Sequence, residues 1–286
     1  MFRVMTFNIG FCGGWDGLSV GPQKRDVIRD RLDSIVQVIR AAECDIVVLQ
    51  EVDCRSRRSG YVDQVAYIRS RSGLPYSEFV TTWKNPWVPY PSVCDVRRHW
   101  GPVHAGNIVM SRHPIVMSRA VELPRRTDKS WMYNLMYLHQ VYHECVVAIP
   151  NRSIRIGHFH LDAFSPDTRI AQVQTILEAI PSAPGTMILA GDFNAVPYHS
   201  GSLYFPDDPE TDYGDDLTLS YLNRRGFSEC RVPNGDPESS GYDFPAREPN
   251  RSLSYVMVTA QMTGTSIALP AIEASDHRPV VADLVI

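Results

Sequence analysis

The sequence predicts a layered α/β protein, because amphipathic helices and apolar strands follow one another along the chain. Between residues 24 and 42, apolar side chains recur at the spacing of one helix face, and the continuous apolar run Cys44–Leu49 follows directly. The same order of helix and then strand returns at residues 166–180 and 186–191. Helices that alternate with buried strands are typical of architectures in which helices cover a sheet.

Further elements follow from the same periodicities. Residues 83–104 are rich in tryptophan, arginine and proline and are expected to be a long loop, whereas residues 106–111 and 114–123 resemble two paired strands. The other expected strands are residues 2–8, 76–82, 143–149, 153–159, 252–258, 262–269 and 279–285, and the other expected helices are residues 60–72 and 216–225.

Composition limits the class of protein. The 286 residues are 44% hydrophobic and 21% charged, which is ordinary for a soluble globular protein with a large core. The net charge of −4 lacks the basic surplus of a protein that coats long nucleic acid. The six cysteines are scattered without a metal-type spacing, and the sequence has neither a signal-peptide pattern nor a membrane-length apolar stretch. We therefore expect a cytoplasmic protein of undetermined oligomeric state.

The run Ala190–Asn194 is the first candidate for a functional site. It follows the apolar residues 187–189, and Asp192 and Asn194 point to the same face if the chain stays extended. An anionic acceptor beside an amide suits a reacting phosphate and its attacking water. The plain alternative is a strand that ends in an Asp-x-Asn turn.

Other strand-like runs also end in polar residues, and their chemistry is coherent. Glu51, Asp276 and Asn8 offer the hard oxygen ligands that Mg²⁺ or Mn²⁺ accepts, and the absence of thiolates from this set argues against structural zinc. His160 and His277 could share proton transfer and charge stabilisation at phosphorus.

Six short motifs together resemble the endonuclease/exonuclease/phosphatase superfamily, which includes deoxyribonucleases, apurinic-site endonucleases, neutral sphingomyelinases and inositol phosphatases. They occur in the family's order between residues 6 and 279. The motifs are Thr6-Phe7-Asn8, Leu49-Gln50-Glu51-Val52, Gly106-Asn107-Ile108-Val109-Met110-Ser111-Arg112-His113-Pro114-Ile115, Phe159-His160-Leu161, Gly191-Asp192-Phe193-Asn194 and Ser275-Asp276-His277-Arg278-Pro279.

The resemblance implies one domain over residues 1–286, folded as a four-layer α/β sandwich with two mixed β-sheets face to face and helices outside. It also implies a Mg²⁺- or Mn²⁺-dependent phosphodiesterase in which Glu51, Asn8 and Asp276 hold the metal. The implied catalytic residues are Asp192, which orients or deprotonates water, Asn194, which holds the phosphate, and His160 and His277, which stabilise the transition state.

One position departs from the family pattern, because Ser254 stands where an aspartate that orients the last histidine is expected. A hydroxyl stabilises an imidazolium less than a carboxylate does. Three interpretations follow: an active enzyme with a less basic His277, substitution by another acid such as Asp243 or Asp283, or a degenerate site in a phosphate-binding module.

The substrate is set by the rim of the site rather than by the fold. Arg97, Arg98 and Trp100, with Asn107 and Asn194, are the expected substrate-binding residues. A phosphodiester in a small molecule or lipid headgroup is the first choice, nucleic acid the second and a phosphomonoester the third. The sequence shows no membrane-seeking helix.

Overall fold

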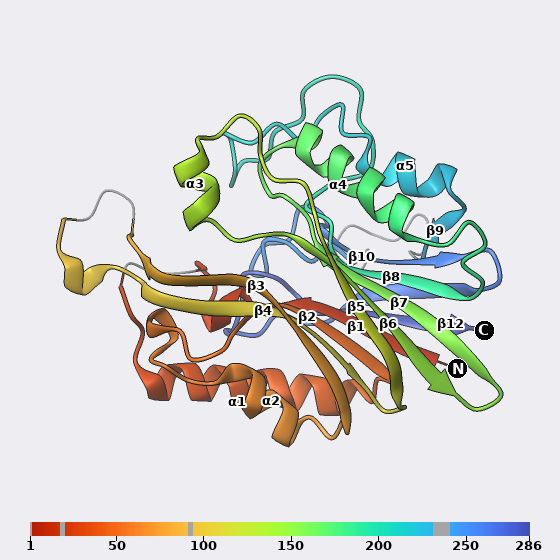
Figure 1. The fold of residues 1–286 in the computed structure, drawn as a ribbon, viewed down its shortest axis with the longest axis horizontal. Coiled ribbons are helices and arrows are strands. Elements are labelled where there is room, and N and C mark those ends of the chain that lie inside the picture. Colours follow the sequence, from red (N-terminus) through yellow and green to blue (C-terminus); the bar gives the residue numbers. More distant parts are fainter. Residues whose placement is uncertain (1, 18–20, 91–93, 231–240) are drawn as a thin grey trace.

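Two mixed β-sheets pack face to face, and helices cover their outer faces, so that the chain forms four layers (Figure 1). Helices α1 and α2 lie against one sheet, and α4 and α5 lie against the other. The helices are α1 (Arg25–Ala42), α2 (Gln64–Arg71), α3 (Trp131–Met136), α4 (Pro166–Ala179) and α5 (Thr218–Arg224). The computed structural model describes residues 2–17, 21–90, 94–230 and 241–286. The predicted four-layer sandwich is confirmed.

Each sheet has six strands and one parallel pair near its centre. The first sheet has the order β11-β12-β1-β2-β4-β3, with β1 and β2 parallel, and the second has the order β5-β6-β7-β8-β10-β9, with β7 and β8 parallel. Because parallel neighbours need a long crossover, α1 joins β1 to β2 and α4 joins β7 to β8. The strands are β1 (Phe2–Asn8), β2 (Ile46–Asp53), β3 (Tyr76–Val88), β4 (Gly101–Ser111), β5 (Ile115–Glu122), β6 (Val141–Ile149), β7 (Arg152–His160), β8 (Met187–Asp192), β9 (Phe227–Glu229), β10 (Ser254–Thr259), β11 (Thr263–Ala268) and β12 (Val280–Val285).

Side chains of the central strands alternate between the core that joins the sheets and the cores under the helices. Along β1, Val4 lies between the sheets, whereas Phe7 packs with the apolar side of α1. Along β8, Ala190 lies between the sheets, whereas Leu189 packs with α4. Both faces of these strands are buried, which explains why their sequences are continuous apolar runs.

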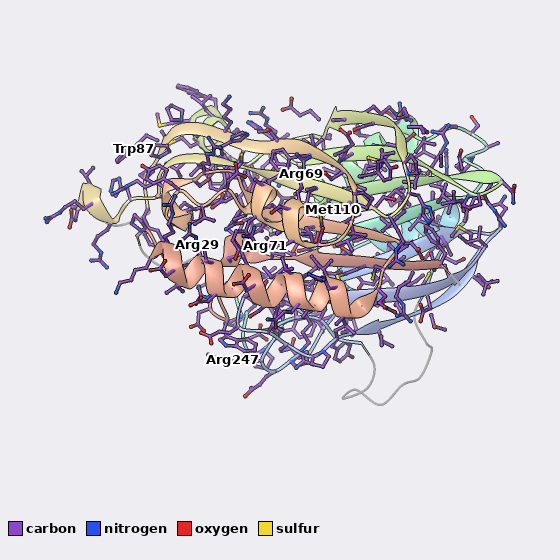
Figure 2. All side chains as sticks on the ribbon, turned by 90° about the horizontal axis from the view of Figure 1, so that it is seen from below. Arg29, Arg69, Arg71, Trp87, Met110 and Arg247 are labelled. Atoms are coloured by element: carbon purple, nitrogen blue, oxygen red, sulfur yellow. The ribbon has the colours of Figure 1, made fainter. Side chains whose placement is uncertain are left out.

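The helices carry their polar side chains on the outside. Figure 2 shows Arg29 of α1 and Arg69 and Arg71 of α2 on this outer face, and all three are exposed. These cations therefore face solvent on the helix layer. No helix in the described parts of the chain combines the length and apolar character needed to cross a bilayer.

Two predictions about the middle of the chain are wrong. Residues 83–104 are not one loop, because β3 continues to Val88 and β4 begins at Gly101, and the two strands extend as a ribbon beyond the sheet (Figure 1). Pro86 is tolerated because β3 is an edge strand. Strands β4 and β5 do not pair with each other, because β4 lies between β2 and β3 while β5 joins β6 in the other sheet.

Candidate active site

The predicted polar side chains meet where the central strands of both sheets end. Asn8 is the last residue of β1 and Asp192 is the last residue of β8. Each lies two residues after a residue of the same strand whose side chain points between the sheets, so each points in that direction as well. Nδ2 of Asn8 donates a hydrogen bond to Oδ2 of Asp192 at 2.9 Å. His160, the last residue of β7, pairs in register with Asp192. The two parallel pairs thus bring residues that are far apart in sequence to one end of the inter-sheet core.

Glu51 reaches this site through a β-bulge. Strict alternation would place Glu51 on the same face as Leu49, which packs under the helices. The register between β2 and β4 shifts between Leu49 and Val52, and Glu51 has a φ of 56°. Left-handed backbone costs a non-glycine residue about 1 kcal/mol, and here it aims the carboxylate between the sheets. Oε1 of Glu51 lies 3.4 Å from Nδ2 of Asn8 and 3.8 Å from Nδ1 of His160.

Asp192 is the centre of the cluster. Its Oδ1 accepts a hydrogen bond from the backbone N of Asn194 at 3.0 Å, so the Asp-x-Asn turn is present. Its Oδ2 lies 3.7 Å from Nε2 of His160 and 3.7 Å from Nε2 of His277. The Asp192 side chain is only 1% exposed. Neighbouring donors, rather than bulk water, therefore stabilise its charge.

Asp243 supplies a carboxylate behind His277. Oδ2 of Asp243 lies 3.4 Å from Nδ1 of His277, and the backbone N of Leu253 donates to Oδ1 of Asp243 at 2.9 Å. Burial lowers the pKa of His277, but the charge of Asp192 and the hydrogen bond to Asp243 outweigh burial and raise this pKa to about 10. His277 is therefore an imidazolium at neutral pH.

Ser254 does not orient the histidine. It stands opposite Asp192 in the β10–β8 pair, and within the described ranges its buried hydroxyl has no hydrogen-bond partner. Its backbone N donates to Asp243 at 3.2 Å. Asp283, the other proposed substitute, forms an ion pair with Arg3 at 2.7 Å. The expectation of a less basic His277 is wrong, because Asp243 folds back beside the imidazole.

Asp276 is held close to the end of β1. The hydroxyl of Ser275 donates to the backbone O of Asn8 at 2.7 Å, and the backbone N of His277 donates to that hydroxyl at 3.1 Å. Burial raises the pKa of Glu51, the nearby His160 lowers it, and the charge of Asp276 raises it again. A buried carboxylate whose ionisation a neighbouring carboxylate disfavours is suited to hold a hard cation.

The clustered side chains line a cavity, and the atoms that this active-site cavity offers fit a divalent cation. The cavity has a volume of about 270 Å³ and is lined by Glu51, Asp192, Asp208 and Asp276, and within the described ranges no lysine or arginine lines it. No group of three or more His, Cys, Asp or Glu side chains in those ranges is arranged as a metal centre. A cation would therefore take part of its ligands from water and substrate, as Mg²⁺ commonly does.

In the metal-free structure the amide of Asn8 bonds to its protein neighbours, and its role as a metal ligand stays a prediction. Its Oδ1 accepts a hydrogen bond from the backbone N of Gly10 at 3.0 Å, and its Nδ2 faces Asp192 and Glu51. The reversed amide would set its oxygen against two carboxylates and its NH₂ against an N–H group. The hydrogen-bond network therefore fixes the orientation of the amide.

The predicted substrate-binding residues are only partly gathered at the site. Asn194 lines the cavity, and buried Asn107 lies beside Glu51 with an Nδ2 that has no partner among the described residues. Trp100 lines an adjoining aromatic cavity. Arg97 and Arg98 are exposed in the turn η3 (Val96–Arg98) of the β3–β4 ribbon, and the structure does not bring them to the site.

Several cavity residues were missed by sequence reasoning, and three of them are aromatic or amide side chains of the cavity wall. The ring of Phe244 lies 4.7 Å from that of His277, and Tyr137 and Gln140 line the cavity wall. None of the three belongs to a motif or to a strand end. In the sequence they differ from other residues only by lying beside aromatic or loop segments. This signal is too weak to identify a site residue.

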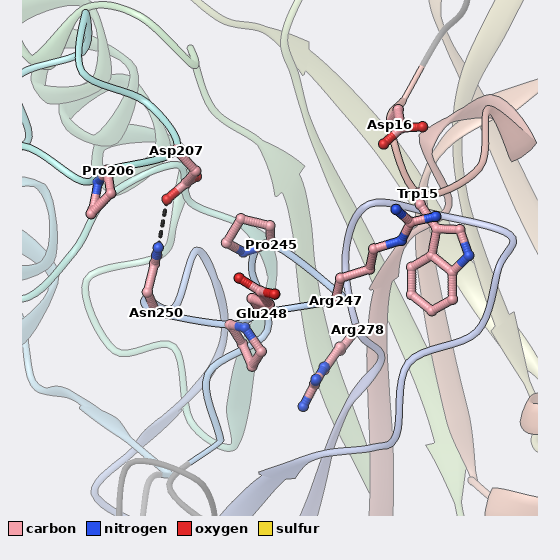
Figure 3. Close-up of a pocket in the computed structure, with 10 residues that line it drawn as sticks. Trp15, Asp16, Pro206, Asp207, Pro245, Arg247, Glu248, Asn250 and Arg278 are labelled. Atoms are coloured by element: carbon pink, nitrogen blue, oxygen red, sulfur yellow. Dashed lines mark hydrogen bonds between the residues drawn. The ribbon is translucent and has the colours of Figure 1, made fainter.

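A larger cavity of about 840 Å³ is lined by Arg278, which follows His277 in the chain (Figure 3). Its cations are Arg278 and Arg247, and the Arg247 guanidinium lies over the ring of Trp15 at 5.2 Å. Its anions are Asp16, Asp207 and Glu248. Three carboxylates against two guanidiniums do not form the positive surface that a nucleic-acid backbone requires.

The fold and the site define a class of four-layer α/β proteins in which carboxylates, amides and two histidines meet at the strand ends. The Endonuclease/Exonuclease/phosphatase family matches residues 5–277, and the chain belongs to this family. Members of the family are hydrolases that act on phosphoester bonds and are generally dependent on divalent metals.

Solved structures share the fold. An endonuclease/exonuclease/phosphatase from Beutenbergia cavernae DSM 12333 has a TM-score of 0.72 and 25% identity, over 99% of this chain and 71% of that chain. The human Nocturnin catalytic domain with bound sulfate has a TM-score of 0.64 and 20% identity, over 99% and 93%. A Bacteroides thetaiotaomicron mannosyl-6-phosphatase has a TM-score of 0.62 and 14% identity, over 100% of both chains. A search of curated proteins gave no match.

Proposed function

We propose that this protein is a Mg²⁺- or Mn²⁺-dependent phosphodiesterase that hydrolyses a phosphodiester in a small molecule or lipid headgroup, with residues 1–286 acting as one domain. The arrangement around Oδ2 of Asp192 carries this proposal. That oxygen accepts a hydrogen bond from Asn8 and lies 3.7 Å from Nε2 of both His160 and His277. One carboxylate and two imidazoles therefore share a single reaction centre.

Asp192 is the proposed base. It takes a proton from water as the water oxygen bonds to phosphorus and the bond from phosphorus to the departing alcohol breaks. Asn8 donates to Oδ2 and the backbone N of Asn194 donates to Oδ1, so the carboxylate is fixed in one orientation before substrate binds. Such positioned proton transfer contributes roughly 10²- to 10⁴-fold to a rate.

The two histidines are proposed to have different tasks. His277, held as an imidazolium by Asp192 and Asp243, donates to the phosphoryl oxygens as their charge grows. His160 lies between Asp192 and Glu51, and because Glu51 is assigned to the cation, we assign His160 the donation of a proton to the departing oxygen. The amide of Asn194, anchored by its Nδ2 to the backbone O of Leu161 at 2.9 Å, would hold the phosphate.

Glu51 and Asp276 are the residues that would hold the cation. A divalent ion bound there would neutralise the negative charge of the phosphoryl group, which the four carboxylates of the cavity cannot do. Asn8 would act beside this pair by keeping Asp192 and Glu51 apart in fixed positions, because its single amide nitrogen lies within 3.4 Å of both.

A small substrate is favoured over nucleic acid by the charge around the site. Acidic residues dominate the active-site cavity, and the neighbouring cavity is of mixed charge. Arg97 and Arg98 lie on the exposed ribbon, where they do not surround the phosphate. A protein that binds many phosphates of a polyanion needs a continuous basic surface, whereas a protein that binds a single phosphodiester does not.

A substrate panel tests this proposal. We expect hydrolysis of bis-p-nitrophenyl phosphate with Mg²⁺ or Mn²⁺, with slower hydrolysis of p-nitrophenyl phosphate and little dependence on salt. Faster cleavage of DNA that declines steeply with added salt would instead identify a nuclease. A faster monoesterase activity would identify a phosphatase, and phosphate binding without turnover of any ester would identify a binding module.

A further inference from the structure

Another cavity, mainly aromatic, adjoins the catalytic one. It has a volume of about 550 Å³ and lies between the β3–β4 ribbon, helix α3 and the turn that carries Phe164. Trp83 and Trp100 come from the ribbon, and Met132 and Met136 come from α3. Figure 1 shows α3 and the ribbon on the same side of the molecule, beyond the ends of the sheets. We call this space the aromatic cavity.

The walls of the aromatic cavity form a connected set of rings. The ring of Trp83 lies 6.0 Å from that of Trp100 and 6.1 Å from that of Tyr137. Tyr137 stacks on Tyr133 at 5.0 Å and lies 6.4 Å from Phe164. Nε1 of Trp83 donates to the backbone O of Met136 at 2.9 Å, which ties the ribbon to α3. The cavity is therefore built by side chains that hold one another in place.

The aromatic cavity shares part of its wall with the catalytic cavity. Tyr137, Leu138, Phe164 and Glu51 line both. A phosphoester whose phosphorus lies near Glu51 and Asp192 therefore has one substituent next to this wall. The catalytic cavity itself is polar, so the two spaces would sort the two ends of a substrate by polarity.

The aromatic cavity offers few hydrogen bonds to a ligand. Glu51 is its only charged lining residue within the described ranges, and it faces His160 and Asn8. The Ser130 hydroxyl already caps α3 by accepting from the backbone N of Tyr133 at 3.2 Å. A sugar, or a base with polar edges, would find few partners here for the hydrogen bonds that it loses from water, whereas a hydrocarbon group needs none.

We propose that the aromatic cavity binds a hydrophobic substituent of the phosphoester substrate, so that the enzyme acts on phosphodiesters of a hydrophobic alcohol. This inference rests on the proposed phosphodiesterase function. An aryl alcohol and a straight-chain alkyl alcohol share the required chemistry, because both present apolar surface without polar edges. Aromatic and methionine walls accept either, since rings stack on aryl groups and methionine adapts its shape.

Helix α3 provides a test with a matched control. Met132 and Met136 line the aromatic cavity and are 52% and 38% exposed, so their truncation leaves the core intact. Leu135 is on the same helix and 60% exposed, but it does not line the cavity. The double variant Met132→Ala/Met136→Ala and the control Leu135→Ala both remove exposed apolar surface from α3, and only the first removes cavity wall.

The first measurement is binding without chemistry. The change in tryptophan fluorescence on addition of 2-naphthol or of 1-octanol is measured with EDTA-treated protein. We expect saturable binding of at least one alcohol, weakened about tenfold by Met132→Ala/Met136→Ala and unchanged by Leu135→Ala, as for lost contacts in an apolar pocket. Which alcohol binds distinguishes an aryl from an alkyl substrate. Binding of neither, or equal weakening by the control, would overturn the proposal.

The second measurement compares hydrolysis of the methyl and 2-naphthyl, or octyl, esters of p-nitrophenyl phosphate. We expect the hydrophobic ester to have a kcat/KM about tenfold higher, with the advantage lost in the double variant. Hydrolysis without this preference would overturn the inference and leave the phosphodiesterase function intact. Alcohol binding without hydrolysis of any ester would overturn both the phosphodiesterase function and the cavity's part in substrate binding.

Discussion

Oδ2 of Asp243 lies 3.4 Å from Nδ1 of His277 and occupies the place behind the imidazole that Ser254 leaves without a carboxylate. Hydrogen bonds hold both the side chain and the backbone of Asp243 in place. Asp243 accepts hydrogen bonds from Leu253 and Ser254, and its backbone O accepts from the backbone N of Arg278 at 2.8 Å. The acid is thus built into the same structure that places the histidine.

Removal of that carboxylate is expected to change the pH dependence of the rate. Burial lowers the pKa of His277, but Asp192 and Asp243 raise it to about 10, so the imidazolium persists until the pH approaches that value. In Asp243→Asn the cation loses one stabilising partner, and the alkaline decline of kcat should move to lower pH by about 1 to 2 units.

The matched control for this prediction is Asp283→Asn, because Asp283 pairs with Arg3 rather than with His277. Its alkaline limb should coincide with that of the wild type. Rate profiles at neutral and alkaline pH check both variants. An unshifted limb in Asp243→Asn would show that Asp243 does not set the charge of His277.

Installing the family's aspartate at position 254 is expected to be harmful while Asp243 is present. Ser254 is fully buried opposite Asp192, and its backbone N bonds to Asp243, so Ser254→Asp adds a third buried carboxylate. An uncompensated buried charge costs roughly 3 kcal/mol or more of the free energy of unfolding. Ser254→Ala should be nearly neutral, because the hydroxyl has no partner in the described structure.

Urea unfolding measures both substitutions, and the double variant Asp243→Asn/Ser254→Asp adds a further check. Moving the carboxylate to the family position should recover part of the activity that Asp243→Asn loses. Equal stability of Ser254→Asp and the wild type, or a double variant less active than Asp243→Asn, would contradict this account of the pair.

Glu51 is expected to bind the cation and to lower the stability of the metal-free protein. Burial raises the pKa of Glu51 and the charge of Asp276 raises it further, against the opposing effect of His160, so the ionised carboxylate destabilises the fold at neutral pH. Glu51→Gln should therefore raise Tm in EDTA, reduce the gain in Tm on adding Mg²⁺, and raise the Mg²⁺ concentration for half-maximal activity about tenfold or more.

The exposed residue Glu178 on α4 provides a control, and Glu178→Gln should change none of these quantities. Thermal unfolding with and without Mg²⁺ gives the result independently of turnover. If Glu51→Gln responds to Mg²⁺ as the wild type does, the cation is not held by Glu51.

Asn8 is expected to affect the rate more than the metal. Its Nδ2 donates to Asp192 at 2.9 Å while its Oδ1 is taken by the backbone N of Gly10. Asn8→Ala should lower kcat by about 10²-fold, since the base loses its fixed orientation, and leave the half-saturating Mg²⁺ concentration within about twofold. Titration of activity with Mg²⁺ separates the two effects. A large rise in the required Mg²⁺ would show instead that Asn8 is a metal ligand.

The sequence predicted the layers and most strands because both faces of the central strands are buried and their apolar runs are unbroken. It also placed Asn8, His160 and Asp192 at strand ends, where the two parallel pairs bring them together. It could not predict the extension of β3, because tryptophan, proline and asparagine in residues 83–88 are also typical of loops.

The sequence predicted Glu51 as a site residue but not how it reaches the site. Alternation alone directs Glu51 toward the helices, and only the bulge with its left-handed φ turns it inward. Asp243 was one of two candidates for the missing acid, and only the folded structure, in which Asp243 contacts His277 and Asp283 contacts Arg3, decides between them. Arg97 and Arg98 were chosen for charge, and both lie in the exposed turn η3 rather than among the residues that line the site.

Hydrolysis of bis-p-nitrophenyl phosphate by the wild type and by Asp192→Asn tests the central claim most directly. The exposed residue Asp26 on α1 gives the control variant Asp26→Asn. We predict turnover that requires Mg²⁺ or Mn²⁺, stops in EDTA, falls about 10³-fold in Asp192→Asn and is unchanged in Asp26→Asn. Metal-independent turnover, or an Asp192→Asn variant within about tenfold of the wild-type rate, would contradict the account.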